Sequence, residues 1–471
     1  AAPRPRHFHR ADIVLRELFF GIAFPVAFLW SLLSAKVAVL VLNWIWFQRP
    51  YEFSWGFWNT QPLFTLAVGI TIVSTIIHRQ FKPRVTPLLG IYLFLLFWLT
   101  LSAAFAYDTR HAWDFYKIFM PSMWLAPVLM VATIHDLKLL KLVFWVAAGG
   151  LGLNAMKVGL SLTLAGGGHL NTYQPGFVGD NNVFALVVCM VVAILIGLRS
   201  TLPRHWLVRA AFWVALGAAL LCIVYTRSRG AYVALGAIFL VGSLLGPRPF
   251  RHSIAVIVVA IAGYWALPDE NFERLQTLRD VRADDSAMGR VENWKLAWDM
   301  TLAHPLLGVG MDNHIPYNRE VVRPEVQVRV AHNVYFQALE GGFPALMLYL
   351  AFLIGAMVSL FNTWRFARRW EGRHRDAQWV SNLAFWSFCA AVGYAVGASF
   401  LNTLYIEFPW MAMLYGSLLG PMFRRQLQAD GLLPSAQSAA ATTNADDASA
   451  APAGQALRSP DRPGRARLSR T

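Results

Sequence analysis

The chain has 471 residues, of which 56% are hydrophobic and 14% aromatic, and its mean hydropathy is +0.45. Soluble domains are about 45–50% apolar, so this composition argues against a string of soluble domains. The formal net charge of +15 does not indicate nucleic-acid binding, because the lysines and arginines lie mostly in short connectors and tails. We attribute it to membrane topology and contact with anionic membrane lipids.

The chain begins with a basic segment, residues 1–16, which is followed by a long apolar run. That run, from about Glu17 to Phe47, exceeds the apolar core of a signal peptide, which is about 7–15 residues long. We therefore expect a retained membrane segment, either one tilted helix or an interfacial helix followed by a span.

Twelve apolar runs are predicted to cross the membrane, since a helix needs about 20 apolar residues to do so. They cover residues 17–47, 61–77, 85–106, 117–134, 142–164, 182–199, 208–225, 230–246, 252–267, 333–361, 379–400 and 406–423. Alternate connectors are rich in lysine and arginine, as cytoplasmic loops are. The pattern predicts an all-α polytopic membrane protein with both termini in the cytoplasm.

The longest connector, residues 268–332, lies between the ninth and tenth predicted spans. Apolar residues recur at helical spacing in 292–302, which predicts short amphipathic helices lying as a lid on the periplasmic surface. Residues 426–471 are rich in Ala, Ser, Pro and Arg and are predicted to be a disordered cytoplasmic tail. A transmembrane domain, residues 17–425, then follows a cytoplasmic N-terminal segment, residues 1–16.

Two arginines, Arg227 and Arg229, lie in the segment Thr226–Ala231. This connector is predicted to be periplasmic, so the enrichment of cytoplasmic connectors in lysine and arginine does not account for them. One interpretation is that their side chains only extend to the membrane interface. The other is a phosphate site, because guanidinium groups beside a helix N-terminus offer paired donors to a phosphate. A third arginine, Arg290, begins the amphipathic helix; it either pairs with a nearby carboxylate such as Glu292 or takes part in the same site.

The large connector ends in His332-Asn333-Val334-Tyr335, and Glu340 follows inside the next apolar run. A histidine at the interface can serve as a general base near neutral pH, although an isolated one is more often structural. An ionisable residue within a span is a functional candidate. The alternative for Glu340 is a hydrogen bond within the helix bundle.

Two further patterns remain open on the sequence alone. Asp180, Asn181 and Asn182 end a glycine-rich loop, where they either cap a helix or bind sugar hydroxyls. His304-Pro-Leu-Leu-Gly-Val-Gly310 is typical of a turn that returns to the membrane face, and its histidine is a candidate helix cap. No set of metal ligands stands out, so arginines are expected to neutralise charge instead of a metal.

Taken in order, these motifs resemble the O-antigen ligase superfamily of bacterial membrane glycosyltransferases. They are Gly-Asp-Asn-Asn, Thr-x-Ser-Arg-Gly, Gly-Arg-x-x-x-Trp, His-Pro-x-x-Gly-x-Gly and His-Asn-x-Tyr with a following Glu, and they span about residues 180–345. The resemblance implies a polyprenyl-pyrophosphate-linked glycan donor, no cofactor and a periplasmic active site on the bacterial inner membrane. Length and topology look most like the ligase, which transfers O-antigen from undecaprenyl pyrophosphate to the lipid A core. The long arginine-rich tail departs from the family pattern.

The resemblance also implies roles for individual residues. His332 would accept the acceptor proton, and Arg229 and Arg290 would stabilise the departing pyrophosphate without a metal. Direct attack would invert the anomeric centre, whereas a carboxylate nucleophile at Glu340 or Asp180 would retain it. The expected substrate-binding residues are Arg227, Asn333, Tyr335, Asp180, Asn181, Asn182, Trp294 and Glu340. The rival functions are O-antigen polymerase, protein O-oligosaccharyltransferase and transporter of lipid-linked glycans.

Overall fold

The computed structural model describes residues 10–54, 56–168, 170, 180–246, 285–322 and 328–434. Two compact units are present: residues 1–423, and residues 424–471, which begin inside the last helix. The predicted span at 252–267 lies outside the described residues, as do 323–327 of the large connector and the tail from 435 onward.

All regular elements in the described ranges are helices. The first group comprises α1 (Arg10–Leu33), α2 (Ala35–Asn43), the π-helix η1 (Trp44–Gln48), the 3₁₀ turns η2 (Pro50–Phe53) and η3 (Phe57–Thr60), α3 (Leu63–Ile77), α4 (Pro87–Ala104), α5 (Thr109–Thr133), α6 (Leu137–Leu164), α7 (Asn181–Leu198), the 3₁₀ turn η5 (Arg199–Thr201), α8 (Trp206–Tyr225) and α9 (Arg229–Leu245). The second comprises α12 (Asp285–Ala303), α13 (His314–Tyr317), the π-helix η8 (Asn318–Val322), α14 (Val334–Ala338), the 3₁₀ turn η9 (Leu339–Gly341), α15 (Gly342–Arg368), α16 (Ala377–Ala398) and α17 (Glu407–Ala429).

Eight helices in the described part of the chain are long and apolar enough to cross a membrane, and three shorter apolar helices accompany them. The prediction of an all-α, multi-pass membrane protein is therefore confirmed. Every predicted run except 252–267 coincides with one or more helices. The count of twelve crossings stays a prediction. The last helix continues to Ala429, four residues beyond the expected end of the transmembrane domain at residue 425.

The first apolar run is not one helix, so the first of the two alternatives for residues 17–47, a single tilted helix, does not hold. The backbone of Ser34 is extended (φ −153°, ψ 117°) and separates α1 from α2. The nine residues of α2 and five of η1 together rise only about 20 Å, less than the roughly 30 Å of a bilayer core. By contrast, α1 contains a candidate span of 20 residues, Val14–Leu33.

The two ends of α1 contact different connectors. Near its start, the Glu17 carboxylate accepts hydrogen bonds from the Ser54 hydroxyl and from the Gly56 N–H, the latter at 2.9 Å. Near its end, the carbonyl oxygen of Leu32 lies 3.0 Å from Nε2 of His78. Thus α1 and α2–η1 form a hairpin. The predicted cytoplasmic side of the N-terminal segment, residues 1–16, stays a prediction.

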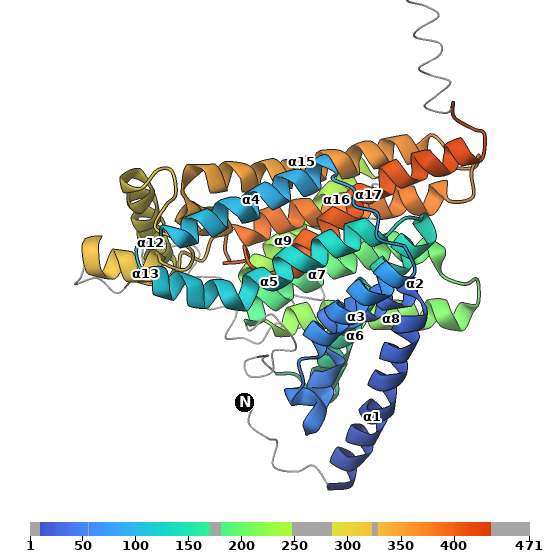
Figure 1. Cartoon of the computed structure of the whole chain (residues 1–471). Helices are drawn as coiled ribbons and strands as arrows, with labels where there is room; N and C mark the ends of the chain where they lie inside the picture. Colours follow the sequence, from blue (N-terminus) through green and yellow to red (C-terminus); the bar gives the residue numbers. More distant parts are fainter. Residues whose placement is uncertain are drawn as a thin grey trace, which may run out of the picture. The chain divides into compact units, whose positions relative to one another are not determined.

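Close approach of backbones organises the rest of the first unit (Figure 1). Helix α16 packs against α7, α9 and α15, and α4 runs beside α15. A Cβ atom on Gly393 of α16 would lie 2.3 Å from Cγ1 of Ile238 in α9, and one on Gly159 of α6 would lie 1.9 Å from the carbonyl oxygen of Ala218 in α8. Such small residues are what membrane helices need at interfaces, where lipid gives no hydrophobic gain for association.

Candidate active site

The turn between α8 and α9 explains two residues of the Thr-x-Ser-Arg motif. The Thr226 hydroxyl donates to the carbonyl of Ile223 at 2.6 Å and accepts the Ser228 N–H at 3.4 Å. The Ser228 hydroxyl accepts the Ala231 N–H at 3.3 Å and so caps α9. Arg227, between them, has a left-handed backbone with φ +53°. The Thr and Ser shape the turn, and the arginines lie at the start of α9.

The Gly-Asp-Asn-Asn motif lies beside this turn. Oδ1 of Asp180 accepts the N–H groups of Asn182 at 2.8 Å and Val183 at 2.9 Å, which caps α7. Nδ2 of Asn181 donates to the carbonyl of Thr226 at 3.1 Å. The cap expected as one alternative for Asp180 is therefore present, and Asn181 ties the start of α7 to the arginine-bearing turn.

The backbone of His332 is left-handed, with φ +48°. Such a conformation costs a residue other than glycine about 1–3 kcal/mol and persists only when its surroundings enforce it. On one side, Nε1 of Trp294 donates to the carbonyl of Ala331 at 2.7 Å. On the other, Oδ1 of Asn402 accepts the Asn333 N–H at 3.1 Å. The histidine is thus fixed through hydrogen bonds to both neighbours.

Helix α12 provides the supporting surface for this segment. The Trp294 ring stacks on the ring of Phe336, with centroids 5.7 Å apart and planes within 5°. Oδ1 of the buried Asn293 accepts the Arg329 N–H at 2.9 Å. Because Arg290 lies one turn earlier on α12, the same helix carries this arginine toward the histidine.

The electrostatics of His332 show which charges surround it. Partial burial lowers its pKa below the ordinary 6.5, the positive charges of Arg290 and Arg329 lower it further, and Asp180 opposes them. His332 is therefore neutral near pH 7. The structure thus brings residues from α12, the start of α7 and the segment before α14 into one electrostatic neighbourhood.

The start of α9, which carries Arg229, approaches the connector between α16 and α17. A Cβ atom on Gly230, the next residue, would lie 3.4 Å from Cβ of Phe400. Asn402, two residues later, bonds the residue after His332. We call Asp180, Arg227, Arg229, Arg290 and His332 the candidate active site.

Tyr335 and Asn333 have structural contacts in this region. The Tyr335 hydroxyl donates to the carbonyl of Ala395 in α16 at 2.8 Å, and Oδ1 of Asn333 accepts the Tyr335 N–H at 2.9 Å, capping α14. These bonds dock α14 on α16. The expected contacts of both residues with substrate stay a prediction.

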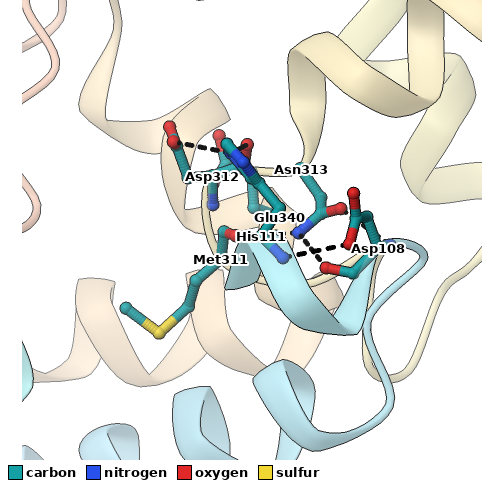
Figure 2. A network of polar contacts seen from close by, with 6 residues as sticks. All are labelled: Asp108, His111, Met311, Asp312, Asn313 and Glu340. Atoms are coloured by element: carbon teal, nitrogen blue, oxygen red, sulfur yellow. Dashed lines mark hydrogen bonds and ion pairs between the residues drawn. The ribbon is translucent and has the colours of Figure 1, made fainter. Parts of the chain in front are cut away.

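Glu340 belongs to a separate polar network, shown in Figure 2. Its buried carboxylate accepts the Asp312 N–H at 2.7 Å, and its carbonyl accepts the Gly310 N–H at 3.0 Å. Nε2 of His111 in α5 lies 3.0 Å from Oδ2 of Asp312, and Oδ1 of Asn313 accepts the Asp108 N–H at 2.9 Å (Figure 2). The network joins the 310–313 segment to the starts of α5 and α15.

The glycines of the His-Pro-x-x-Gly-x-Gly motif make this junction possible. Gly308 has φ +65°, and a Cβ atom there would lie 2.1 Å from the carbonyl oxygen of Glu340. Gly342 has φ +78°, and its Cβ would lie 2.2 Å from the carbonyl oxygen of Leu306. The motif therefore wraps around the break that starts α15. The N–H of His304 bonds within α12, and its ring packs edge-on against Tyr317. This gives Glu340 a structural role, and its expected contact with substrate stays a prediction.

Two residues that hold His332 in place, Asn402 and Asn293, were not among the predicted site residues. Asn402 lies in a short polar break between two apolar runs, and Asn293 lies in the amphipathic helix. Polarity alone could have marked Asn402, but its partner is 69 residues away in the chain.

Two family models match the chain. Residues 15–205 match a family of unknown function, DUF5935, in a range that includes the start of α7. Residues 214–350 match the O-antigen ligase family, in a range that includes Arg229, Arg290, His332 and Glu340. No curated protein and no solved structure matches the chain. The second match covers most of the motifs found in the sequence, and it supports membership of the O-antigen ligase superfamily.

Proposed function

We propose that this protein is an O-antigen ligase, which transfers O-antigen from undecaprenyl pyrophosphate to a sugar hydroxyl of the lipid A core. Family membership supports glycosyl transfer of the ligase or polymerase type and lipid-linked polysaccharide substrates in general. The donor, the acceptor and a periplasmic active site on the inner membrane are our proposal. It rests chiefly on the neighbourhood of a neutral His332 with Arg290 and Asp180.

In this mechanism, His332 acts as the general base. The acceptor hydroxyl oxygen attacks the anomeric carbon of the donor sugar while its proton passes to a ring nitrogen of His332. The bond from the anomeric carbon to the pyrophosphate oxygen breaks, and undecaprenyl pyrophosphate leaves. Such catalysis contributes about 10²–10⁴ in rate. Direct displacement inverts the anomeric centre.

The charge of Asp180 fits this role. Once protonated, His332 carries a positive charge, and Asp180 favours that form whereas Arg290 disfavours it. Since Oδ1 of Asp180 is fixed by the cap of α7, the carboxylate has a defined position. We therefore assign Asp180 to stabilising the imidazolium rather than to nucleophilic attack.

Arg229 and Arg290, assisted by Arg227, would bind the pyrophosphate. A guanidinium group offers paired hydrogen-bond donors to phosphate oxygens, and it stabilises the negative charge that develops as the sugar leaves. The positive end of the α9 helix dipole lies beside these arginines and also favours an anion. In our proposal this arrangement serves in place of a metal ion.

The test supplies each acceptor separately to the purified protein with lipid-linked O-antigen. Product formed only with rough lipopolysaccharide supports the ligase. Extension of a second lipid-linked chain would indicate a polymerase, and glycosylation of a pilin-like peptide would indicate a protein O-oligosaccharyltransferase. Movement of the donor across proteoliposomes with no covalent product would favour a transporter and overturn the proposal.

A further inference from the structure

The far end of α15 carries three arginines on one face. This helix has 27 residues and rises about 40 Å, so its last turn lies about a bilayer thickness away from the break at Gly342. Arg365, Arg368 and Arg369 are three and four residues apart and therefore share one side of the helix. All three are exposed.

A surface cavity of about 440 Å³ lies beside them. Its lining combines cations with aromatic and aliphatic side chains: Leu245, Phe361, Trp364, Arg365, Arg368 and Arg369. The guanidinium carbon of Arg365 lies 5.9 Å from the ring centroid of Phe361, and that of Arg368 lies 5.8 Å from the ring of Trp364. These contacts hold two cations along the cavity wall.

The three arginines form no ion pair with a carboxylate within the part of the chain that the structure describes. Arg375, in the same connector, pairs with Asp376 at 3.4 Å. Like charges three and four residues apart repel one another. A bound anion would therefore reduce the electrostatic repulsion among the three arginines.

The surface leading away from the arginines is apolar. Ile354 and Val358 of α15 are exposed, as are Leu240 and Leu244 of α9. Both helices pack on α16, and the cavity lies where their last turns meet the arginine cluster. A ligand here would have an anionic end at the depth of lipid headgroups and an apolar end toward the bilayer core.

We propose that this cavity binds an anionic glycerophospholipid. The lipid phosphate accepts hydrogen bonds from Arg365 and Arg368, and an acyl chain lies along Phe361 and Leu245. Paired guanidinium donors suit a phosphate, and basic pockets between membrane helices recognise anionic headgroups. A small water-soluble anion would not use the apolar wall. The site is distinct from the candidate active site, which lies at the other end of α15.

The test measures lipid binding to the full-length protein by native mass spectrometry. Phosphatidylglycerol and phosphatidylethanolamine with identical acyl chains are compared on wild type, on R365Q/R368Q and on R373Q/R375Q. The last variant removes the same amount of charge from the connector that follows α15, without changing a residue that lines the cavity. We expect wild type and R373Q/R375Q to prefer phosphatidylglycerol. R365Q/R368Q should bind it about 30-fold more weakly, which corresponds to about 1 kcal/mol for each arginine.

If both double variants lose the same amount of phosphatidylglycerol affinity, the preference comes from general surface charge and the proposal is overturned. Equal binding of the two lipids by wild type would do so too. Inorganic phosphate that displaces phosphatidylglycerol at matched concentration would reveal a soluble-anion site instead. If R365Q/R368Q does not fold, the single variant R368Q decides, with an expected loss of about fivefold for one arginine; unchanged binding by R368Q would then refute the lipid site.

Discussion

The hydrogen bond from the Asn333 N–H to Oδ1 of Asn402 makes Asn402 a positioning residue for His332. Replacing Asn402 by alanine leaves this N–H, in a buried residue, without its acceptor. An unsatisfied buried donor costs about 1–3 kcal/mol, and the strained backbone of His332 can relax to avoid that cost. If the whole cost appears as misplacement of the base, kcat for glycosyl transfer falls about 5- to 150-fold, whereas KM changes little.

The conservative variant separates positioning from general stability. Asn402→Asp keeps an acceptor oxygen, so it should recover most of the activity at alkaline pH. Its new negative charge near His332 raises the pKa of that imidazole, so the acid limb of the pH–rate profile should move to higher pH. Ser399→Ala is the control, because the Ser399 hydroxyl donates to the carbonyl of Val396 in the last turn of α16. Wild-type kcat in Asn402→Ala, or an unmoved acid limb in Asn402→Asp, would refute this reasoning.

Three further predictions follow from the same geometry. Because burial and Arg290 lower the pKa of His332, the acid limb of the wild-type pH–rate profile should lie below pH 6.5. Arg290→Gln should move this limb to higher pH. A wild-type acid limb above pH 7 would contradict the role of His332 as general base. Arg290→Lys should lower kcat by about tenfold or more if paired contact with the diphosphate matters, and full activity would mean that a point charge suffices. Gly308→Ala should lower the melting temperature more than Gly372→Ala does, because both have positive φ but only Gly308 faces a carbonyl, that of Glu340; equal shifts in thermal unfolding would contradict this.

Apolar periodicity predicted most helices because each span must satisfy its own backbone hydrogen bonds in lipid. It missed two breaks that lie inside apolar runs. Ser34 ends α1, with the single charge of Lys36 two residues later, and Gly342 starts α15 where the 306–310 segment crosses it.

The sequence predicted part of the candidate active site, because the motif residues fall in connectors that the predicted topology places on one side of the membrane. The predicted spans 230–246 and 252–267 separate Arg229 from His332, so the predicted topology assigns both residues to the same side of the membrane. Their supports were not predictable, because they are pairings between distant segments. Asn402 reaches Asn333, and Trp294 reaches Ala331, through tertiary packing that no local pattern encodes.

The initial rate of O-antigen transfer to rough lipopolysaccharide, measured with purified wild type and His332→Ala in the presence of EDTA, tests the central claim most directly. Wild type should keep its rate in EDTA. The rate of His332→Ala should be about 10²–10⁴-fold lower than that of wild type, although the variant still binds the donor. Near-normal transfer by His332→Ala, or abolition of wild-type transfer by EDTA, would contradict a metal-independent reaction in which this histidine takes the acceptor proton.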